Sequence, residues 1–184
     1  RRLWRGRGPQ AFVPGEGAQE RARGAQAITG LPPRSARDVR LLVDGAAKYD
    51  ALLEAIAAAR RTVHLEYYIF NPDRIGTRVR DALVERARAG VQVRLLLDAV
   101  GSSDVGSRFL RPLREAGGEV AFFHPMRLRL WKRPWLNLRT HRKIAVIDGR
   151  VGFTGGINVT DEEDERARDD AYRDLHLRLE GPVV

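Results

Sequence analysis

The residues best suited to chemistry gather between Leu138 and Val159. His141 and Lys143 stand two residues apart, and the apolar residues 144–147 that follow predict a strand buried on both faces. Because side chains alternate along a strand, this spacing would put an imidazole and an ammonium group on the same face. A neutral imidazole is a nucleophile or base near neutral pH, and an ammonium group is a compact charge that binds phosphate oxygens. The pair therefore predicts a site for phosphate chemistry.

The alternative is that His141 is a satisfied core histidine and Lys143 a solvated lysine. The composition argues for the functional interpretation, since only three of the 33 basic residues are lysines. Arginine is a wide planar fork and cannot replace a point charge in a tight phosphate pocket. A lysine in a chain that otherwise uses arginine is therefore a candidate functional residue.

A glycine-rich stretch follows the predicted strand. Asp148 and Gly149 predict a tight turn into a second short strand, which runs to Gly155, Gly156 and Asn158. Because glycine has no side chain, a ligand could approach the backbone at Gly155 and Gly156, and the Asn158 amide can donate a hydrogen bond. We expect this backbone to lie beside the His141 and Lys143 pair.

Length and composition bound the class of protein. With 184 residues, 43% of them hydrophobic, the chain can form one sizeable domain. The absence of cysteine excludes disulfides and thiolate metal sites. No apolar run approaches the roughly 20 residues of a membrane span, and we expect no signal peptide. The formal charge of +9 favours anionic membranes, nucleic acid or phosphate-bearing substrates.

The order of elements predicts an α/β fold with a mixed, largely parallel β-sheet flanked by helices. Strand, helix and strand follow one another with short links, which is typical of right-handed parallel βαβ units. Asp98 would then lie at the carboxyl edge of the sheet, where α/β proteins place ligands. The loop after it lacks the spacing of a nucleotide-binding turn and is expected to be ordinary. The predicted strands are 39–43, 62–70, 91–97 and 119–123, and the predicted helices are 46–61, 77–89 and 105–116.

Two segments have no clear period. Residues 1–37 are rich in Arg, Gly and Pro and predict a basic, weakly structured arm, which either contacts lipid headgroups or is simply solvated. Residues 124–138 mix arginine, leucine and two tryptophans, Trp131 and Trp135. This mixture suits a membrane interface, and a long connection packed on the protein is the open alternative.

Three smaller patterns concern polar residues near predicted strands. His64 and Glu66 share a strand face and either face a site or, as we expect, satisfy each other. Thr160 with Glu163 fits a capping box, ahead of an acidic run to Asp170 that predicts a solvated helix and loop. Residues 174–179 alternate as a strand in which Asp174 and His176 share one face.

Taken together, His141-x-Lys143 followed by Asp148 resembles the H-x-K-x4-D signature of the phospholipase D superfamily. The stretch Gly155-Gly156-x-Asn158 is similar to the element that follows it in that family. The closer resemblance is to the amino-terminal halves of bacterial cardiolipin synthases. It extends over most of the chain and is carried by LLVDG, HLEYYIF, GVQVRLLLDAVGS, NLRTHRKIAVIDGRVGFTGGIN and RDLHLRLEGPVV. It implies a phospholipase D-like α-β-α sandwich, one of two lobes, over residues 38–184.

The resemblance also implies roles for matching positions. His141 would attack phosphorus to give a phosphohistidine, while Lys143 and Asn158 hold the non-bridging oxygens. Asp174 would hydrogen-bond His141 and support the cation that forms. Asp148 begins a turn on the opposite strand face and is assigned a structural role. No metal or cofactor is implied, and the expected substrate contacts are Gly155, Gly156, Arg139, Glu66, Trp131 and Trp135.

Sites of this family use two H-x-K-x4-D copies, because a second histidine protonates the leaving alcohol. Only His141 of the four histidines here lies in the motif. The second copy would come from a longer chain that continues past Val184 or from a homodimer mate. We favour the longer chain, because the ending EGPVV coincides with the point where cardiolipin synthases pass into their second half.

The expected activity is transfer of a phosphatidyl group between two phosphatidylglycerol molecules, giving cardiolipin and glycerol. A hydrolytic phospholipase D and a nuclease of the same superfamily are the alternatives, and an inactive membrane-binding module is a further one. The expected partners are an anionic phospholipid, the membrane surface and the second motif, with nucleic acid as the lesser alternative. We expect peripheral association with the cytoplasmic side of a bacterial membrane.

Overall fold

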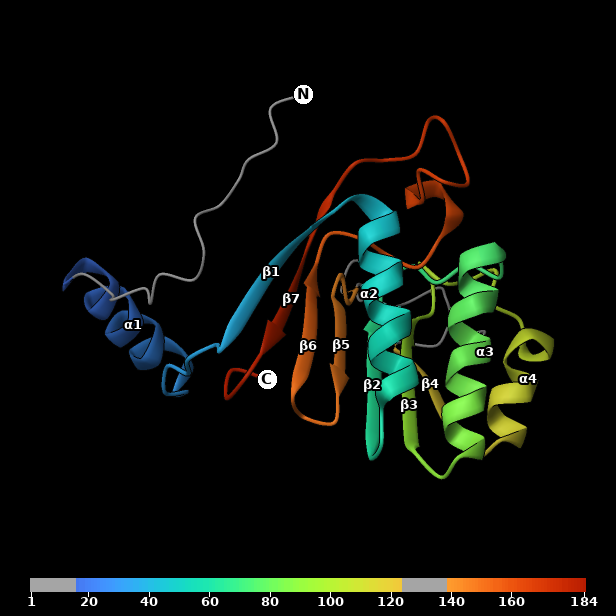
Figure 1. Ribbon diagram of the computed structural model, residues 1–184, viewed down its shortest axis with the longest axis horizontal. Coiled ribbons are helices and arrows are strands. Elements are labelled where there is room, and N and C mark those ends of the chain that lie inside the picture. The colour runs from blue at the N-terminus through green and yellow to red at the C-terminus, as the bar shows by residue number, and fades with distance from the viewer. Residues whose placement is uncertain (1–15, 124–138) are drawn as a thin grey trace, which may run out of the picture. The chain divides into compact units, whose positions relative to one another are not determined.

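The computed structural model describes residues 16–123 and 139–184, which fall into two compact units, 1–35 and 36–184 (Figure 1). In the first unit, helix α1 spans Glu16–Thr29. The prediction of little regular structure in the arm is therefore wrong for these residues. Alanine, glutamate, glutamine and arginine favour a helix strongly enough to outweigh the two glycines between them.

The second unit is built on one seven-stranded sheet with the order β1-β7-β6-β5-β2-β3-β4. Its strands are β1 (Asp38–Val43), β2 (Thr62–Tyr67), β3 (Gln92–Asp98), β4 (Glu119–Phe123), β5 (Lys143–Ile147), β6 (Val151–Gly155) and β7 (Leu175–Glu180). Its helices are α2 (Asp44–Ala58), α3 (Arg74–Arg88), α4 (Ser107–Glu115) and the short 3-10 helix η3 (Asp161–Glu163).

The sheet is mixed, as predicted, but its parallel part is smaller than expected. Only the β2–β3 and β3–β4 pairs are parallel, and they form the two predicted βαβ crossovers. The β5–β2, β6–β5, β7–β6 and β1–β7 pairs are all antiparallel. The prediction of a largely parallel sheet extended the βαβ pattern too far, because β5 pairs antiparallel with β2 and the strands β6, β7 and β1 continue the sheet in antiparallel pairs.

Helices α2, α3 and α4 cover the same face of the sheet (Figure 1). The core between them is apolar and includes Tyr49 and Leu52 of α2, Leu83 of α3 and Leu65 of β2, each nearly or fully buried. In the described part of residues 36–184 the arrangement therefore has two layers, a sheet and one helical layer, where a three-layered sandwich was expected.

A carboxylate in the β5–β6 turn ties this hairpin to the end of α2. Asp148 and Gly149 both have left-handed backbone, with φ of 55° and 61°. Asp148 Oδ1 accepts hydrogen bonds from the amides of Arg61 and Thr62 at 2.8 Å, and Oδ2 accepts from Arg60 at 3.0 Å. Burial alone would raise the pKa of Asp148, but these bonds together lower it below its usual value.

We expect Asp148→Asn to lower the free energy of unfolding by about 1–2 kcal/mol at pH 7, because one amide hydrogen bond is replaced by a clash of two donors. A carboxyl with a depressed pKa in the folded state stabilises the protein above its unfolded pKa, about 4. The difference between the two proteins should therefore shrink below about pH 4 and vanish as the pH falls through the folded-state value. Urea unfolding across this pH range measures it.

Asp169→Asn provides the matched control, since Asp169 is exposed and removing its charge should leave the unfolding free energy nearly unchanged. Equal stability of wild type and Asp148→Asn at pH 7 would contradict the structural role of this carboxylate.

Candidate functional site

His141 and Lys143 lie side by side at the start of β5. The strand begins at Lys143, so His141 precedes it and the prediction that both lie on the strand is wrong for His141. The Lys143 Nζ atom is nevertheless 3.1 Å from His141 Nε2 and 3.1 Å from the His141 carbonyl oxygen. The Tyr68 ring, just after β2, packs on the His141 ring with centroids 4.7 Å apart.

The contact with Lys143 has a consequence for the state of His141. An ammonium group can only donate, so when Lys143 is charged the His141 Nε2 atom carries the lone pair and the ring proton is on Nδ1. Lys143 is 3% exposed, whereas His141 is exposed. Burial lowers the pKa of Lys143, and the carboxylates of Glu163 and Asp174 partly oppose this. The pair thus combines an accessible imidazole with a buried cation.

Asn158 is buried and hydrogen-bonded through both its backbone and its amide. Its Oδ1 accepts from the Ile69 amide at 3.1 Å, and its Nδ2 donates to Glu163 Oε1 at 2.7 Å. The Asn158 amide N–H donates to Glu163 Oε2 at 2.7 Å, and its carbonyl accepts from Lys48 Nζ and Tyr49 Oη at 3.0 Å each. One N–H of Nδ2 therefore has no acceptor among the described residues.

Protein atoms occupy the space beside Gly155 and Gly156. A Cβ at Gly155, where φ is 156°, would lie 2.5 Å from the Leu175 carbonyl oxygen. A Cβ at Gly156 would lie 2.0 Å from Asp174 Oδ2. These glycines let β7 and a carboxylate approach the backbone, which is a different reason from the predicted approach of a ligand.

Asp174 itself is exposed and precedes β7, which begins at Leu175, so it does not share a strand face with His176 as predicted. Its Oδ1 accepts from the Leu175 amide at 2.6 Å, and its carbonyl accepts from the Asp44 amide at 2.9 Å. Its charge acts on Lys143. Its predicted hydrogen bond with His141 stays a prediction.

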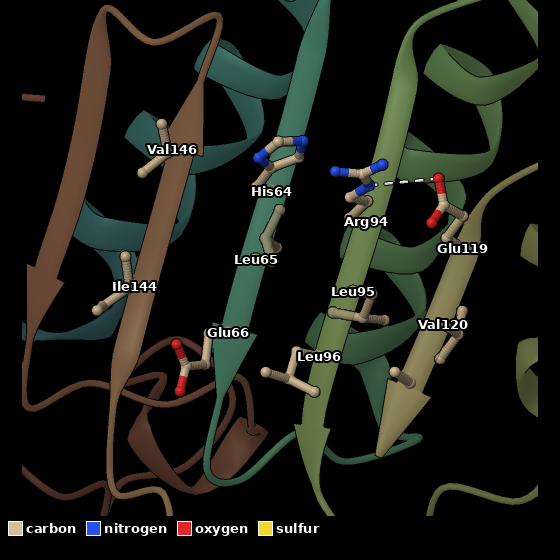
Figure 2. A pocket seen from close by; sticks show the side chains of 11 residues that line it. His64, Leu65, Glu66, Arg94, Leu95, Leu96, Glu119, Val120, Ile144 and Val146 are labelled. Atoms are coloured by element: carbon tan, nitrogen blue, oxygen red, sulfur yellow. Dashed lines mark hydrogen bonds and ion pairs between the residues drawn. The ribbon is translucent and has the colours of Figure 1, made fainter. Parts of the chain in front are cut away.

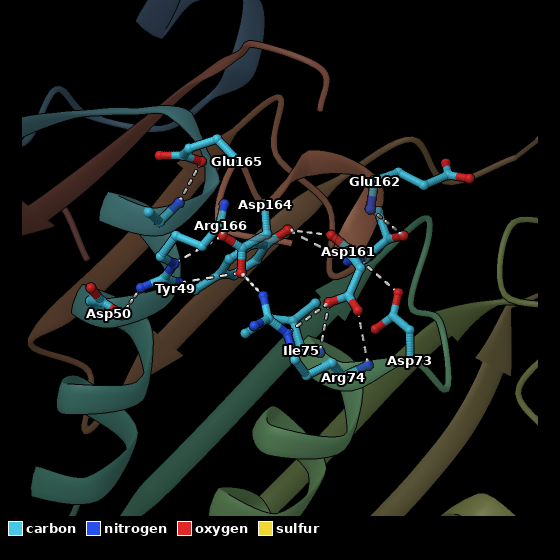
Figure 3. Close-up of polar contacts among 12 residues, drawn as sticks. Tyr49, Asp50, Asp73, Arg74, Ile75, Asp161, Glu162, Asp164, Glu165 and Arg166 are labelled. Atoms are coloured by element: carbon cyan, nitrogen blue, oxygen red, sulfur yellow. Dashed lines mark hydrogen bonds and ion pairs between the residues drawn. The ribbon is translucent and has the colours of Figure 1, made fainter. Parts of the chain in front are cut away.

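The acidic run after Asn158 is bonded to the domain in its first part, as Figure 3 shows. The prediction of a solvated segment is wrong for Glu163 and Asp164, which are buried, and holds for Glu162 and residues 165–170, which are exposed. Asp161 accepts from the Arg74 and Ile75 amides at the start of α3, at 3.2 and 2.9 Å, and its own amide donates to Asp73 at 2.7 Å. Asp164 is fully buried and pairs with Arg74 at 3.0 Å. The loop is therefore anchored to a core helix.

The predicted capping box is only half present. The Thr160 side chain accepts from the Glu162 amide at 3.3 Å, so it caps the 3-10 helix η3. The Glu163 carboxylate bonds to Asn158 instead of returning to the Thr160 amide. A 3-10 turn is too short to present Glu163 in the geometry of an α-helical box.

Two further titratable groups are buried beneath the site. Lys48 of α2 is fully buried, with its Nζ 4.5 Å from the Tyr49 ring centroid and 4.7 Å from that of Tyr67. Burial lowers its pKa well below the usual value, and Glu163 opposes the shift. Burial, followed by the charges of Lys48 and Lys143, lowers the pKa of His176 to about 3. His176 is therefore neutral near pH 7.

Glu66 connects the site to the sheet. Its Oε1 accepts from Thr140 Oγ1 at 2.5 Å and lies 3.7 Å from Arg142 Nη1. The predicted mutual pair with His64 is wrong, since His64 Nε2 has no hydrogen-bond partner among the described residues, and Figure 2 shows the two side chains apart. Buried Asp98 accepts from the Thr140 amide at 3.3 Å, which fixes the segment before His141 from the carboxyl edge of the sheet.

A groove of about 530 Å³ lies on the sheet face opposite the helices (Figure 2). Figure 2 shows Glu66 near one end and His64, Arg94 and Glu119 towards the other, with aliphatic side chains between. Neither His141 nor Lys143 lines it. Of the other predicted substrate contacts, Arg139 is half-buried two residues before His141, while Trp131 and Trp135 lie outside the described residues.

Sequence reasoning missed three residues of this arrangement: Lys48, Tyr68 and Glu163. Lys48 carried the same signal as Lys143, a lysine in a chain that otherwise uses arginine. Tyr68 lies in the predicted strand 62–70, where nothing in the sequence marks it, and the sequence predicts Glu163 only as part of a cap. In the described part of the chain, no cluster of three or more metal-ligating side chains occurs, and no helix is long and apolar enough to cross a membrane.

Comparison with solved structures supports the fold. The phospholipase D family member Nuc from Salmonella typhimurium superposes with a TM-score of 0.57 at 17% identity, over 78% of this chain and 83% of Nuc. Phosphatidylserine synthase from Haemophilus influenzae Rd KW20 superposes with a TM-score of 0.65 at 15% identity, over 86% of this chain and 37% of that protein. At these identities the likeness shows the fold alone.

Sequence comparison shows the family as well as the fold. Cardiolipin synthase 1 of Bacillus cereus is 43% identical over 160 residues, which are 86% of this chain and 31% of that protein. The major cardiolipin synthase ClsA of Bacillus subtilis is 44% identical over 147 residues, 79% of this chain and 30% of that protein. The chain thus spans about a third of the length of these curated relatives. The family described as "Cardiolipin synthase, PLD-like domain" matches residues 52–171. The resemblance predicted from the motifs is confirmed, and the chain belongs to this family.

Proposed function

We propose that this chain supplies one half of the active site of a cardiolipin synthase-type phosphatidyltransferase. His141 Nε2 attacks the phosphorus of phosphatidylglycerol, so that a P–N bond forms and the bond to the glycerol oxygen breaks. The hydroxyl of a second phosphatidylglycerol then attacks the phosphohistidine, so that a P–O bond forms and the P–N bond breaks. Its proton passes to the histidine of the second half, and the product is cardiolipin. Two displacements through a covalent intermediate replace one difficult step.

The observation that carries this proposal is the contact of Lys143 Nζ with His141 Nε2 at 3.1 Å. It leaves the attacking nitrogen with its lone pair and puts a cation where negative charge develops on the phosphate. A phosphate oxygen that binds Lys143 would take over this hydrogen bond and release the lone pair for attack. Asn158 contributes its remaining Nδ2 donor, and Asp174 the carboxylate that supports the phosphohistidine.

The leaving glycerol oxygen needs a proton, and the described residues offer no suitable second histidine. His176 is fully buried and neutral near pH 7, with neither ring nitrogen hydrogen-bonded. His64 lies in the groove on the sheet face, and its Nε2 is buried. We therefore assign the general acid to a second H-x-K-x4-D half, in a longer chain or a homodimer mate.

The substrate class follows from charge and family. A chain of net charge +9 is attracted to anionic headgroups, which supports peripheral binding to the cytoplasmic side of a bacterial membrane. Hydrolysis of the same intermediate by water would make the enzyme a phospholipase D. A nuclease of the same superfamily is the other candidate, because a net charge of +9 also attracts nucleic acid. The product distinguishes all three activities.

The protein completed by its second half should convert phosphatidylglycerol vesicles to cardiolipin and glycerol, with mass spectrometry as the readout. His141→Ala should lower the rate by more than about 10³-fold, because the displacement has no other nucleophile. Phosphatidic acid as the main product would identify a hydrolase, and cleavage of a short DNA offered separately would identify a nuclease. Full cardiolipin synthesis by His141→Ala would refute the role of His141.

A purified monomer of residues 1–184 should release no cardiolipin, phosphatidic acid or cut DNA, because the general acid is missing. Light scattering establishes the oligomeric state of each sample before its activity is measured. Activity confined to a dimer would place the second motif in a mate. Activity of a verified monomer, lost in His141→Ala, would show that one motif suffices and overturn the two-half arrangement.

A further inference from the structure

Glu163 lies at the centre of a buried polar cluster that also contains Lys48, Asn158 and Lys143. Its side chain belongs to a residue only 9% exposed, and its two oxygens bind the amide N–H and the Nδ2 of Asn158, each at 2.7 Å. Its charge also acts on both Lys48 and Lys143. One carboxylate thus contacts the predicted phosphate-binding amide and acts through its charge on the predicted phosphate-binding lysine, which is buried like it.

The contacts of Asn158 leave its amide a single orientation. The Ile69 amide must meet an acceptor, which is Oδ1, and the Glu163 carboxylate must meet a donor, which is Nδ2. A flipped amide would place two donors together at Ile69 and two acceptors together at Glu163. The one N–H without a protein acceptor in the described ranges therefore has a fixed direction.

Lys48 contacts the backbone carbonyl of Asn158, whereas Glu163 contacts its N–H groups. Its Nζ donates to the Asn158 carbonyl at 3.0 Å, and the Tyr49 hydroxyl donates to the same oxygen at 3.0 Å. A fully buried ammonium group is costly without a counter-charge. The Glu163 carboxylate, which bonds Asn158 from the other side, is the counter-charge of Lys48. Lys48 and Glu163 therefore fix Asn158 from two sides.

The loop that carries Glu163 is itself held in place. Asp161 caps the start of α3, and Glu165 Oε2 accepts from the Ala46 amide in α2 at 3.0 Å. A Cβ at Gly45 would lie 1.8 Å from the Glu163 carbonyl oxygen, so α2 approaches the loop as closely as only glycine permits. Figure 3 shows this bonding between the loop and both helices.

We propose that Glu163 is a positioning residue, which acts together with Lys48 to orient the Asn158 amide and supplies a buried counter-charge to Lys143 beside His141. Its effect on turnover rests on the proposed function above, whereas its effect on the charge of Lys143 does not. The groups that face Lys143 are His141 before β5, the Tyr68 ring after β2, Glu163 in η3, Asp174 before β7 and His176 in β7.

The first test titrates the lysines of residues 1–184 directly. The chain has only three lysines, so ¹³Cε-labelled lysine gives a simple NMR spectrum that Lys→Arg variants assign. Glu163→Gln removes the carboxylate but keeps its size, and the titration midpoint of Lys143 should fall. Glu162→Gln is the matched control, since this neighbouring carboxylate is exposed, and it should leave the midpoint in place. An unchanged midpoint in folded Glu163→Gln would overturn the proposal.

A second variant covers the case in which Glu163→Gln fails to fold because Lys48 loses its counter-charge. Lys48→Met combined with Glu163→Gln removes both buried charges and should restore folding. The Lys143 midpoint should be lower in this double variant than in Lys48→Met alone, and equal midpoints in these two variants would equally overturn the proposal.

The second test uses the pH dependence of turnover by the complete enzyme. Lys143 must be charged to bind phosphate oxygens, so activity is lost as the pH rises through its pKa. Because Glu163 raises that pKa, Glu163→Gln should move the alkaline limb of kcat/KM to lower pH and reduce kcat about 10- to 100-fold near neutrality. A uniform loss at every pH would mark a merely structural residue. A wild type without turnover would refute the proposed function and leave the lysine titration to decide the role of Glu163.

Discussion

The antiparallel pairing of β5 with β2 is the constraint on which the site depends. It sets Tyr67 opposite Lys143 and Glu66 opposite Ile144, so the residues just after β2 lie beside those just before β5. Tyr68 then meets His141, and the Glu66 carboxylate reaches Thr140. At the other end of the same strand pair, the Asp148 carboxylate accepts hydrogen bonds from the two amides before β2 and from the first amide of β2. The pair is thus fixed at both ends, and a slip in register would separate His141 from its neighbours.

This register also puts Lys143 on the helix-covered face, where a charge is expensive. Lys143, Ala145 and Ile147 alternate as the buried residues of β5. A cation in such surroundings is stable only if a carboxylate and good hydrogen bonds offset its desolvation. Glu163 acts on both buried lysines, and the loop that carries it is bonded to α2 and α3. The acidic run after Asn158 is therefore part of the support of the site.

Local patterns were enough to predict the βαβ units and the proximity of His141 to Lys143. Alternation of side chains along a strand is not the reason for this proximity. His141 precedes the strand, and the Lys143 side chain extends back to contact it. The pairing of β5 with β2 and of β7 with β1 joins residues far apart in sequence, which periodicity cannot specify. The partner of Glu163 was missed for the same kind of reason, because a capping box considers only contacts within one helical turn.

His141 and Lys143 differ in exposure, and this difference bears on the proposal that the chain supplies one half of a site. Lys143 and Asn158 are held in a low-dielectric interior, where their interactions with a phosphate are strong. His141 is exposed, so a phosphate bound to it by this chain alone would remain largely in water, where the same interactions are weak. A second motif that closed over His141 would bring the missing acid and exclude this water in one step. The proposed second half is therefore supported by the exposure of His141, the proposed nucleophile, as well as by the number of histidines.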